Sequence, residues 1–368
     1  MTTHVVCLDG TGQVKSQPNP TNVSKIFDAL GGTAVDGGNN SWETTSPAGS
    51  PGQTGKYLPG VGTQGNAVLQ WLGKGFGDGI AEQIVRGYTF LSRNYAPGDH
   101  LAIVGFSRGA AAARALAGVV AVQGLLDNTR YDSSDKDASY LRAIAAWYFY
   151  RQHNPAYANQ DRLTDVADVA GTPPTLTDAD FLKVQQVDAV GVFDTVSSVG
   201  LPQVGLDGKA IYDFNICDTK LNPVVARGFH ALAADEVRGV FAPTFWTARA
   251  GITQVIFPGA HSNVGGGYPE TGLSNRPLQW MLDQLASVGV DFPNLPNLTI
   301  DALDIARDDS TSFPFTVLPK DPRLFPDDAV CDASIVTRWG ATTTILAADL
   351  IGPYAAQGTF AGGRPIHP

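Results

Sequence analysis

The feature that most constrains the fold of this chain is the stretch His100–Ala117, HLAIVGFSRGAAAARALA. An apolar run at 101–104 enters the pattern Gly-x-Ser-x-Gly at 105–109, and an alanine-rich segment follows it. This order predicts a strand, a sharp turn and a helix. Such a turn exposes the Ser107 hydroxyl above the helix N-terminus, where N–H groups stabilise negative charge. The glycines leave room for the neighbouring strand and helix.

The rest of the chain alternates between strand and helix patterns. Strands are predicted at 4–8, 101–104, 187–193 and 254–258, and helices at 22–30, 80–95, 110–126, 138–153, 224–237 and 277–288. Residues 31–65 are predicted to form a long loop or a short hairpin. The alternation implies right-handed crossovers and a mostly parallel central sheet flanked by helices.

A serine becomes a nucleophile when a base takes its proton, and an acid orients that base. Of the six histidines, only His261 follows the C-terminal end of a predicted strand in a glycine-rich loop. Asp194 follows the apolar run 187–193 in the same way. The C-terminal ends of parallel strands share one edge of a sheet, so Ser107, Asp194 and His261 are predicted to converge as a catalytic triad. Their order along the chain is that of an α/β-hydrolase.

Each of these assignments has an alternative. The turn at Ser107 also suits a bound phosphate or a purely structural role. His261 is alternatively a loop histidine bonded to a backbone carbonyl, and His230 is expected to be packed within a helix. The acids that compete with Asp194 are Asp188, Asp213 and Asp235.

Attack on a carbonyl carbon creates an oxyanion, which two backbone N–H groups must stabilise. Arg108, the residue after the serine, is expected to supply one of them. The second is expected from the loop after the first strand, at Gly10 or Thr11, because glycine lets the backbone approach closely. An ordinary tight turn explains residues 9–12 equally well.

These patterns predict a single α/β-hydrolase-like domain over residues 1–368. The aromatic and polar region 128–182 is expected to form an inserted helical cap, and residues 290–368 a C-terminal extension packed on the core. Within the cap, an aromatic stripe is a candidate lining for an acyl pocket, although such stripes more often belong to a core. The stripe consists of Trp147, Tyr148 and Phe149.

Composition limits the partners of the chain. The formal net charge of −10, with no run of Lys or Arg, argues against a nucleic-acid partner. Cys7, Cys217 and Cys331 lack metal-ligand spacing, which predicts buried thiols in a reducing compartment and no metal site. No signal peptide or transmembrane helix is visible, so the expected location is the cytoplasm, or outside the cell after export without a classical signal.

Several motifs in a fixed order carry a resemblance to a known family. They are DGTG at 9–12, TNV at 21–23, YLPGVGT at 57–63, GFSRGA at 105–110, VGVFDTVSSVG at 190–200, FHALAADEVRGVFAP at 229–243, FPGAHSNVGGGY at 257–268 and GLSNRPLQWML at 272–282. Together they resemble the catalytic domain of type VI secretion phospholipase effectors, an α/β-hydrolase family formerly catalogued as a domain of unknown function. The resemblance implies hydrolysis of acyl-lipid esters by a serine triad at Ser107, Asp194 and His261. It implies no cofactor, and a lipid substrate would bring transient contact with a membrane.

The chain departs from that family at Asn263 and Asn275, where relatives usually carry acids. Any cation binding or loop positioning by those acids would be weakened here. A long amphipathic helix rich in Lys and Arg, which would bind a bilayer, is also missing. The favoured function is therefore hydrolysis of carboxylic esters of a lipid or another apolar acyl substrate. The alternatives are a protein that binds phosphate at residues 9–12 and at the Ser107 turn, and a non-catalytic relative.

Overall fold

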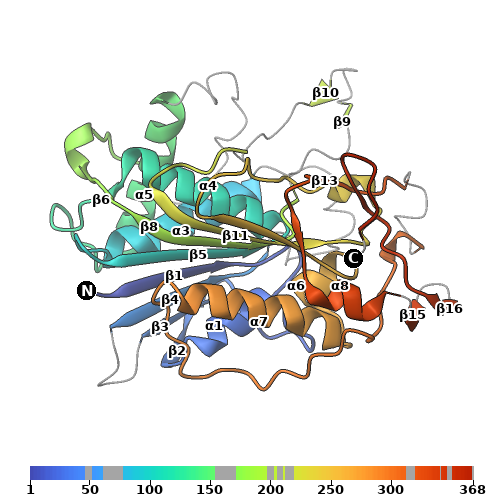
Figure 1. Ribbon diagram of the computed structural model, residues 1–368. Coiled ribbons are helices and arrows are strands. Elements are labelled where there is room, and N and C mark those ends of the chain that lie inside the picture. The colour runs from blue at the N-terminus through green and yellow to red at the C-terminus, as the bar shows by residue number, and fades with distance from the viewer. Residues whose placement is uncertain are drawn as a thin grey trace.

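The computed structural model describes residues 1–45, 52–60, 78–153, 171–196, 203–204, 210–211, 219–311, 320–339, 341–345 and 350–366. In this part of the chain, helices cover both faces of one large sheet, which gives three layers (Figure 1). Two apolar clusters fill the space between the layers, one on each face of the sheet. The mostly parallel sheet flanked by helices is confirmed.

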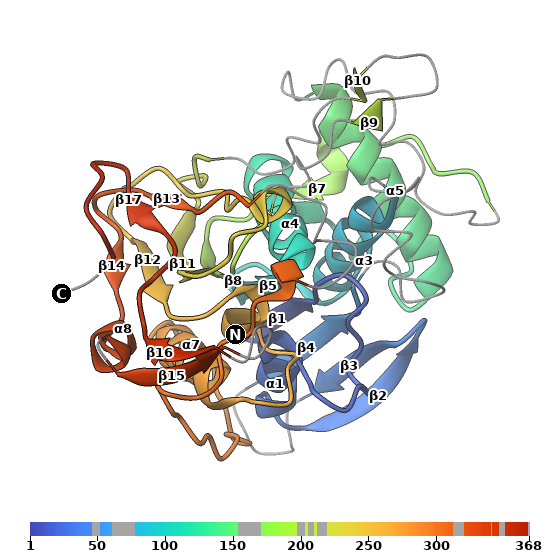
Figure 2. The same cartoon turned by 90° about the vertical axis from the view of Figure 1, so that its right-hand side faces the viewer.

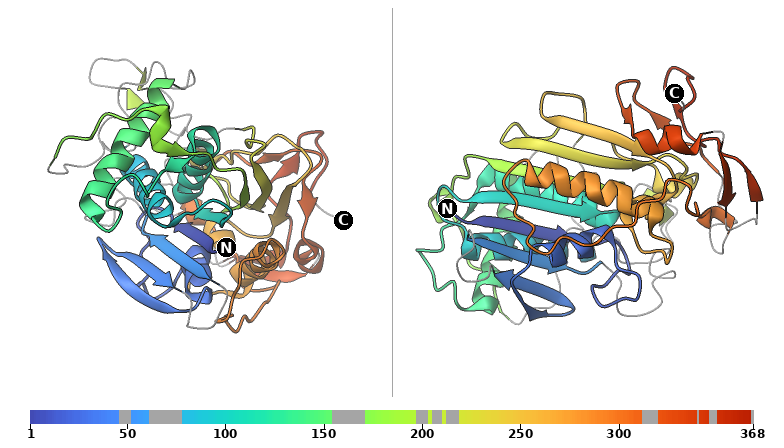
Figure 3. Two further views of the ribbon diagram at one scale, coloured as in Figure 1. Left: turned by 90° about the vertical axis from the view of Figure 1, so that its left-hand side faces the viewer. Right: turned by 60° about the horizontal axis from the view of Figure 1, so that its bottom comes forward.

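The sheet has the strand order β14-β12-β11-β8-β5-β1-β4-β3-β2. All strands from β14 to β4 in that order are parallel, and the hairpin β2–β3 closes one edge antiparallel. The bounds are β1 (Thr3–Leu8), β2 (Thr33–Gly38), β3 (Ser41–Thr45), β4 (Gln53–Leu58), β5 (His100–Phe106), β8 (Val187–Phe193), β11 (Val225–Ala233), β12 (Ile252–Phe257) and β14 (Val330–Cys331). Figure 3 shows the hairpin and the C-terminal segment at opposite edges.

The helices divide between the two faces of the sheet. One face carries α1 (Asn22–Ala29) and α7 (Gly272–Ala286). The other carries α3 (Asp78–Asn94), α4 (Arg108–Gln123) and α5 (Lys136–His153). α4 is buried on nearly every side, because its alanines let it lie close to the strands beneath it.

One predicted helix is a central strand of the sheet. Residues 224–237 were expected to be helical, and the structure instead has the strand β11 (Val225–Ala233) between β8 and β12. Residues 228–233 are all buried, so the segment lacks the polar alternation that marks a half-exposed strand. A short apolar run of this kind cannot be told from a buried helix by its periodicity.

The order in which strands are added to the sheet reverses its direction between β1 and β5. From β1 it goes on through α1 and the hairpin to β4 on one side, whereas from β5 it goes through α4 to β8 on the other. Loops that leave two adjacent parallel strands in opposite directions mark a topological switch point, beside which open α/β sheets bind their ligands. Figure 2 views the molecule from the side on which these strands end.

The segment after α7 packs beside the ends of β11 and β12. It contains β13 (Leu324–Phe325) paired with β17 (Thr359–Phe360), the hairpin of β15 (Thr342–Ile345) and β16 (Leu350–Pro353), and α8 (Ala333–Arg338). A third apolar cluster joins it to the sheet through Leu232, Ile256, Phe325, Ile335 and Phe360.

The region expected to be a cap is described only in part, because residues 154–170 lie outside the described residues. Trp147 of α5 is buried in the core, and Tyr148 and Phe149 are half-buried against it. The remaining short elements are β6 (Leu125–Leu126), β7 (Phe181–Leu182), β9 (Gln203–Val204), β10 (Ala210–Ile211), α6 (His261–Gly265) and three 3₁₀ turns at Asp178–Asp180, Gly239–Phe241 and Asp309–Thr311. Within the described ranges, no helix has both the length and the hydropathy needed to cross a bilayer.

Candidate active site

Ser107 lies at a sharp turn between β5 and α4, with φ of 57° and ψ of −121°. Side chains avoid this backbone region, and the conformation costs about 1–3 kcal/mol. The turn is packed tightly, because a Cβ on Gly105 would lie 2.4 Å from the Gly109 carbonyl oxygen, and one on Gly109 would lie 2.3 Å from the Leu8 carbonyl oxygen. The surrounding packing therefore holds Ser107, which is 7% exposed, in a strained position.

His261 and Asp194 form a buried pair. His261 begins α6 after β12, Asp194 follows β8, and His261 Nδ1 lies 2.5 Å from Asp194 Oδ2. Because an ionised carboxylate only accepts hydrogen bonds, Nδ1 carries the proton and Nε2 is left with a free lone pair. Nε2 is buried and has no hydrogen-bond partner among the residues that the structure describes. A nitrogen in this state can accept a proton.

Backbone contacts bring this pair next to Ser107. The Ser107 N–H donates to the Phe193 carbonyl at 3.1 Å, and the Val196 N–H donates to the Ser107 carbonyl at 3.4 Å, so both sides of Asp194 are bonded to the serine turn. The rings of Phe106 and His261 lie 4.6 Å apart. The structure thus pairs Asp194 with His261 and places the serine turn against the loop that carries Asp194. Ser107 Oγ does not bond Nε2, and such hydrogen bonds often form only when substrate binds.

Arg323 makes a fork of hydrogen bonds to the carboxylate of Asp194. Its Nη1 donates to Oδ1 at 2.6 Å and its Nη2 donates to Oδ2 at 2.8 Å. The Ala233 N–H donates to Oδ1 at 3.0 Å. Burial alone would raise the pKa of Asp194, but the Arg323 charge and the hydrogen bonds from His261 and Arg323 lower it well below its ordinary value. Asp194 is therefore ionised at neutral pH.

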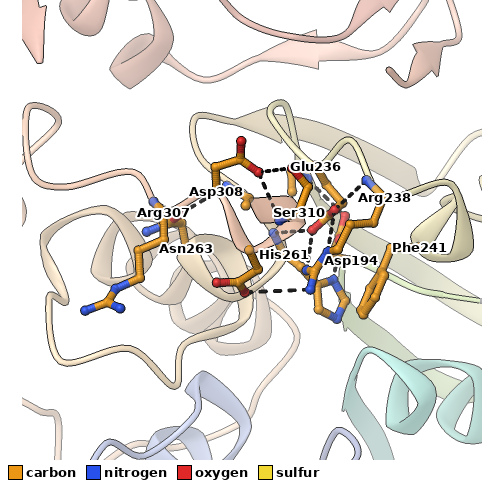
Figure 4. A network of polar contacts seen from close by, with 12 residues as sticks. Asp194, Glu236, Arg238, Phe241, His261, Asn263, Arg307, Asp308 and Ser310 are labelled. Carbon is orange, nitrogen blue, oxygen red and sulfur yellow. Dashed lines mark hydrogen bonds and ion pairs between the residues drawn. The ribbon is translucent and has the colours of Figure 1, made fainter. Parts of the chain in front are cut away.

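A second buried carboxylate, Glu236, lies beside His261 (Figure 4). It accepts two hydrogen bonds from the Arg238 guanidinium, at 2.8 and 2.6 Å, and one from the His261 N–H at 3.4 Å. The guanidinium lies 3.9 Å from the centre of the Phe241 ring, and the centre of that ring lies 4.8 Å from the centre of the His261 ring. Burial raises the pKa of Glu236, and the bonds and charge of Arg238 outweigh this and lower it. Neither Glu236 nor Arg323 was predicted from the sequence as a site residue.

The competing histidine supports the loop after Asp194. His230 lies in β11, where its Nε2 accepts a hydrogen bond from the Thr195 N–H at 3.2 Å. Burial and the charge of Arg114 lower the pKa of His230 to about 3, so its ring is neutral. It is packed, as expected, although in a strand and not in a helix.

The competing acids are engaged elsewhere. Asp188 accepts from the Leu101 N–H at the opposite end of the sheet, and Asp235 accepts from the Gly259 N–H. Asp213 lies outside the described residues. Of the acids that the structure describes among these candidates, Asp194 is the one bonded to His261.

The loop after β1 lies against the serine turn. A Cβ on Gly10 would be 3.1 Å from Ser107 Cβ, and Arg108 Nε donates to Thr11 Oγ1. The Gly10 N–H, however, donates to Asp9 Oδ1 at 2.8 Å, so it is engaged within the loop. The Thr11 N–H and the N–H of Arg108, the first residue of α4, are the remaining donors predicted for an oxyanion.

Hydrogen bonds to the Asp9 carboxylate connect this loop to α1 and β4. Its Oδ2 accepts from Thr21 Oγ1 and from the Tyr57 hydroxyl, each at 2.7 Å. Burial raises the pKa of Asp9 to about 6, and the hydrogen bonds from Tyr57, Thr21 and Gly10 oppose this rise. The DGTG motif is therefore more than an isolated turn, because its aspartate bonds residues of α1's N-cap and of β4.

Asn263 and Asn275 make hydrogen bonds that a carboxylate could not. Asn263 Nδ2 donates to the Ile305 carbonyl at 3.1 Å, and Asn275 Nδ2 donates to the Thr299 carbonyl at 2.9 Å. Lys25 Nζ, whose pKa burial lowers to about 8, donates to Asn275 Oδ1. In the described part of the chain, no group of three or more His, Cys, Asp and Glu side chains could hold a metal ion.

Comparison with known proteins agrees with the resemblance of the motifs. The family model described as "T6SS, Phospholipase effector Tle1-like, catalytic domain" matches residues 2–284. Uncharacterized protein YEL023C of Saccharomyces cerevisiae is 26% identical over 257 residues, which are 66% of this chain and 32% of that protein. The chain therefore spans about a third of the length of this curated relative.

Two solved structures are similar over part of their length. An uncharacterized protein from Pseudomonas aeruginosa has 18% identity and a TM-score of 0.42, and the match covers 82% of this chain and 47% of that one. The Tle1 effector bound to the VgrG spike of the type 6 secretion system has 21% identity and a TM-score of 0.41, and the match covers 74% and 52%. Because the family model covers most of the chain, the chain belongs to the family of Tle1-like catalytic domains of type VI secretion phospholipase effectors.

Proposed function

We propose that this chain is a serine hydrolase of the α/β-hydrolase type, which cleaves carboxylic esters of lipid or other apolar acyl substrates. The observation that carries the proposal is the 2.5 Å hydrogen bond between His261 Nδ1 and Asp194, next to a serine held at φ of 57°. Membership of a phospholipase effector family supports a lipid ester as substrate.

In the proposed reaction, Ser107 Oγ attacks the ester carbonyl carbon while His261 Nε2 takes the hydroxyl proton. Asp194 fixes the tautomer of the ring and stabilises the imidazolium that forms. The tetrahedral intermediate collapses, the C–O bond to the leaving alcohol breaks, and His261 donates the proton to that alcohol. A water molecule then attacks the acyl-enzyme with His261 again as base, which releases the fatty acid and restores Ser107.

For the oxyanion, we propose the N–H groups of Arg108 and Thr11. Arg108 directly follows the nucleophile, and Thr11 directly follows Gly10, whose Cβ would lie 3.1 Å from Ser107 Cβ. Of the two residues predicted for the second donor, Gly10 already gives its N–H to Asp9, which favours Thr11. The hydrogen bond from Arg108 Nε to Thr11 Oγ1 would keep the two donors in a fixed relation.

We further propose that residues 1–368 form one domain, with region 128–182 as an inserted helical cap and residues 290–368 as a C-terminal extension packed on the core. A lipid substrate requires transient contact with a membrane surface. The family supports export by a type VI secretion system, which needs no classical signal peptide.

The test is hydrolysis of p-nitrophenyl esters from acetate to palmitate, and of phosphatidylcholine vesicles, by the wild type and by Ser107→Ala. Ser287→Ala is the matched control, because its hydroxyl bonds the Gln284 carbonyl at the end of α7. Hydrolysis that is lost in Ser107→Ala and kept in Ser287→Ala supports the proposal. Equal rates in all three proteins, or no hydrolysis by the wild type, would refute it.

A further inference from the structure

We propose that Arg323 is a positioning residue for the reaction, which holds Asp194 in its productive conformation and balances the charge of that carboxylate beside His261. The inference rests on the proposed function, and it adds a residue from outside the region that defines the family, residues 2–284. No catalytic motif surrounds Arg323, so the sequence alone does not point to it.

The hydrogen bonds of Arg323 hold its guanidinium in one position, and this bonded guanidinium is called the clamp below. Its guanidinium donates to both carboxylate oxygens of Asp194 and also to the carbonyls of Ala233, at 2.9 Å, and Phe241, at 2.7 Å. The side chain is 2% exposed. A planar guanidinium with these partners is restricted in both position and rotation, which a single point charge would not be.

The C-terminal segment anchors this clamp to the sheet. Phe325, two residues further on, is fully buried in the cluster that includes Leu232 and Ile256 of the sheet. The carbonyl of Arg323 accepts from the Thr359 N–H at 2.9 Å, where β13 pairs with β17. The guanidinium is thus placed by packing that is independent of the Asp194 loop.

Asp194 lies in a left-handed turn of the backbone. Its φ is 43°, in the left-handed region that L residues other than Asn and Asp rarely adopt. The Asp194 N–H donates to the Ala231 carbonyl at 2.7 Å, and the next N–H, of Thr195, donates to His230. These bonds fix the backbone, whereas the fork from Arg323 fixes the carboxylate on which His261 depends.

The Arg323 guanidinium also balances the negative charge of Asp194 beside the His261 imidazole. Within the described residues, the charged groups that face the His261–Asp194 pair are Arg323 on Asp194 and Glu236, which is itself paired with Arg238. His230, which lies near Asp194, is neutral. The imidazole therefore faces two carboxylates that are each paired with an arginine. Removal of Arg323 leaves the charge of Asp194 uncompensated, so His261 is expected to become protonated at higher pH.

The test compares kcat against pH for the wild type, Arg323→Met and Arg323→Lys, with p-nitrophenyl butyrate as substrate. We expect Arg323→Met to lower kcat by about tenfold to a hundredfold, because the carboxylate loses its fixed position. We also expect the acid limb of the profile to move up by about one pH unit. Arg323→Lys, which keeps a cation but not the fork, is expected to lower kcat with little change in the acid limb.

Arg276→Met is the matched control. Arg276 makes a similar fork, with Nε 3.0 Å from Asp332 Oδ1 and Nη2 2.8 Å from Oδ2, and it also ties the C-terminal segment to the core. A general effect of loosening that segment would appear in this variant too. We expect Arg276→Met to lose some stability and to keep the wild-type acid limb.

An NMR titration separates this inference from the proposed function. The ring signal of His261, assigned with His261→Gln, reports proton uptake without any substrate, so it remains decisive even if the wild type hydrolyses no ester. The inference would be overturned if the midpoint of the His261 titration in Arg323→Met were that of the wild type. It would also be overturned if Arg323→Met had the kcat and the acid limb of the wild type. If Arg323→Met does not fold, Arg323→Lys decides, since a wild-type kcat in that variant would contradict a role for the fork.

Discussion

The buried pair of Asp194 and Arg323 allows a double-mutant cycle whose result can be worked out from the contacts. Each oxygen of Asp194 accepts from two donors, Oδ1 from Ala233 and Arg323 and Oδ2 from Arg323 and His261. If the side-chain NH₂ of an asparagine took the position of either oxygen, it would face only hydrogen-bond donors. Asp194→Asn therefore loses two hydrogen bonds and leaves a buried guanidinium unpaired, which we expect to cost about 3–5 kcal/mol of the free energy of unfolding.

Arg323→Met should cost a similar amount, because it leaves the Asp194 charge without its cation. The double variant buries neither charge unpaired, so its loss should fall short of the sum of the single losses by about 2 kcal/mol. Urea unfolding of the four proteins at pH 7 measures this coupling. In parallel, Asp194→Asn should lower kcat by about 10⁴-fold, and the second substitution should not restore it. Additive losses of stability, or recovered activity in the double variant, would refute the reasoning.

Three further predictions concern the serine turn and the loop beside it. Ser107→Gly should be more stable than Ser107→Ala by about 1 kcal/mol in urea unfolding, because glycine adopts the φ of 57° without a Cβ clash, and equal stability would argue against strain. Asp9 has a pKa of about 6 in the folded chain against 3.8 ordinarily, so the folded state binds more protons between about pH 4 and pH 6 and its stability falls as pH rises through that window. Between about pH 4 and pH 6, the free energy of unfolding of the wild type should therefore fall by up to about 3 kcal/mol relative to that of Asp9→Asn. A difference in unfolding free energy that stays constant across these pH values would contradict the raised pKa. Gly109→Ala, whose Cβ would lie 2.3 Å from the Leu8 carbonyl oxygen, should cost about 1–3 kcal/mol of the free energy of unfolding. Gly118→Ala on the same helix should cost nothing, because its Cβ would make only an ordinary contact, 3.7 Å from the Tyr150 hydroxyl; similar melting temperatures for the two variants would disprove this.

Local patterns were enough to predict the serine turn and most of the elements around it. The strand 187–193 and the helix behind Ser107 depend on residues that are neighbours in the chain, and both are present. The convergence of Asp194 and His261 followed from one global rule, that parallel strands end at the same edge. The pairing of these two side chains agrees with that rule.

The remaining features depend on contacts that no local pattern records. β11 is buried on both faces, so its sequence lacks the alternation that would have distinguished it from a helix. Arg323 meets Asp194 across 129 positions of sequence, in a segment predicted only as an extension packed on the core. Glu236 lies within a conspicuous motif, but only the fold shows that it bonds the His261 N–H.

The proposed reaction depends on Ser107 as a nucleophile that His261 activates. The most direct measurement is mass spectrometry of the protein after reaction with a p-nitrophenyl alkylphosphonate, with the adduct mapped to a peptide. We predict a single adduct on Ser107 in the wild type, and its loss in His261→Gln at the same reagent concentration and time. An adduct on another residue, or equal labelling of Ser107 in His261→Gln, would contradict the account.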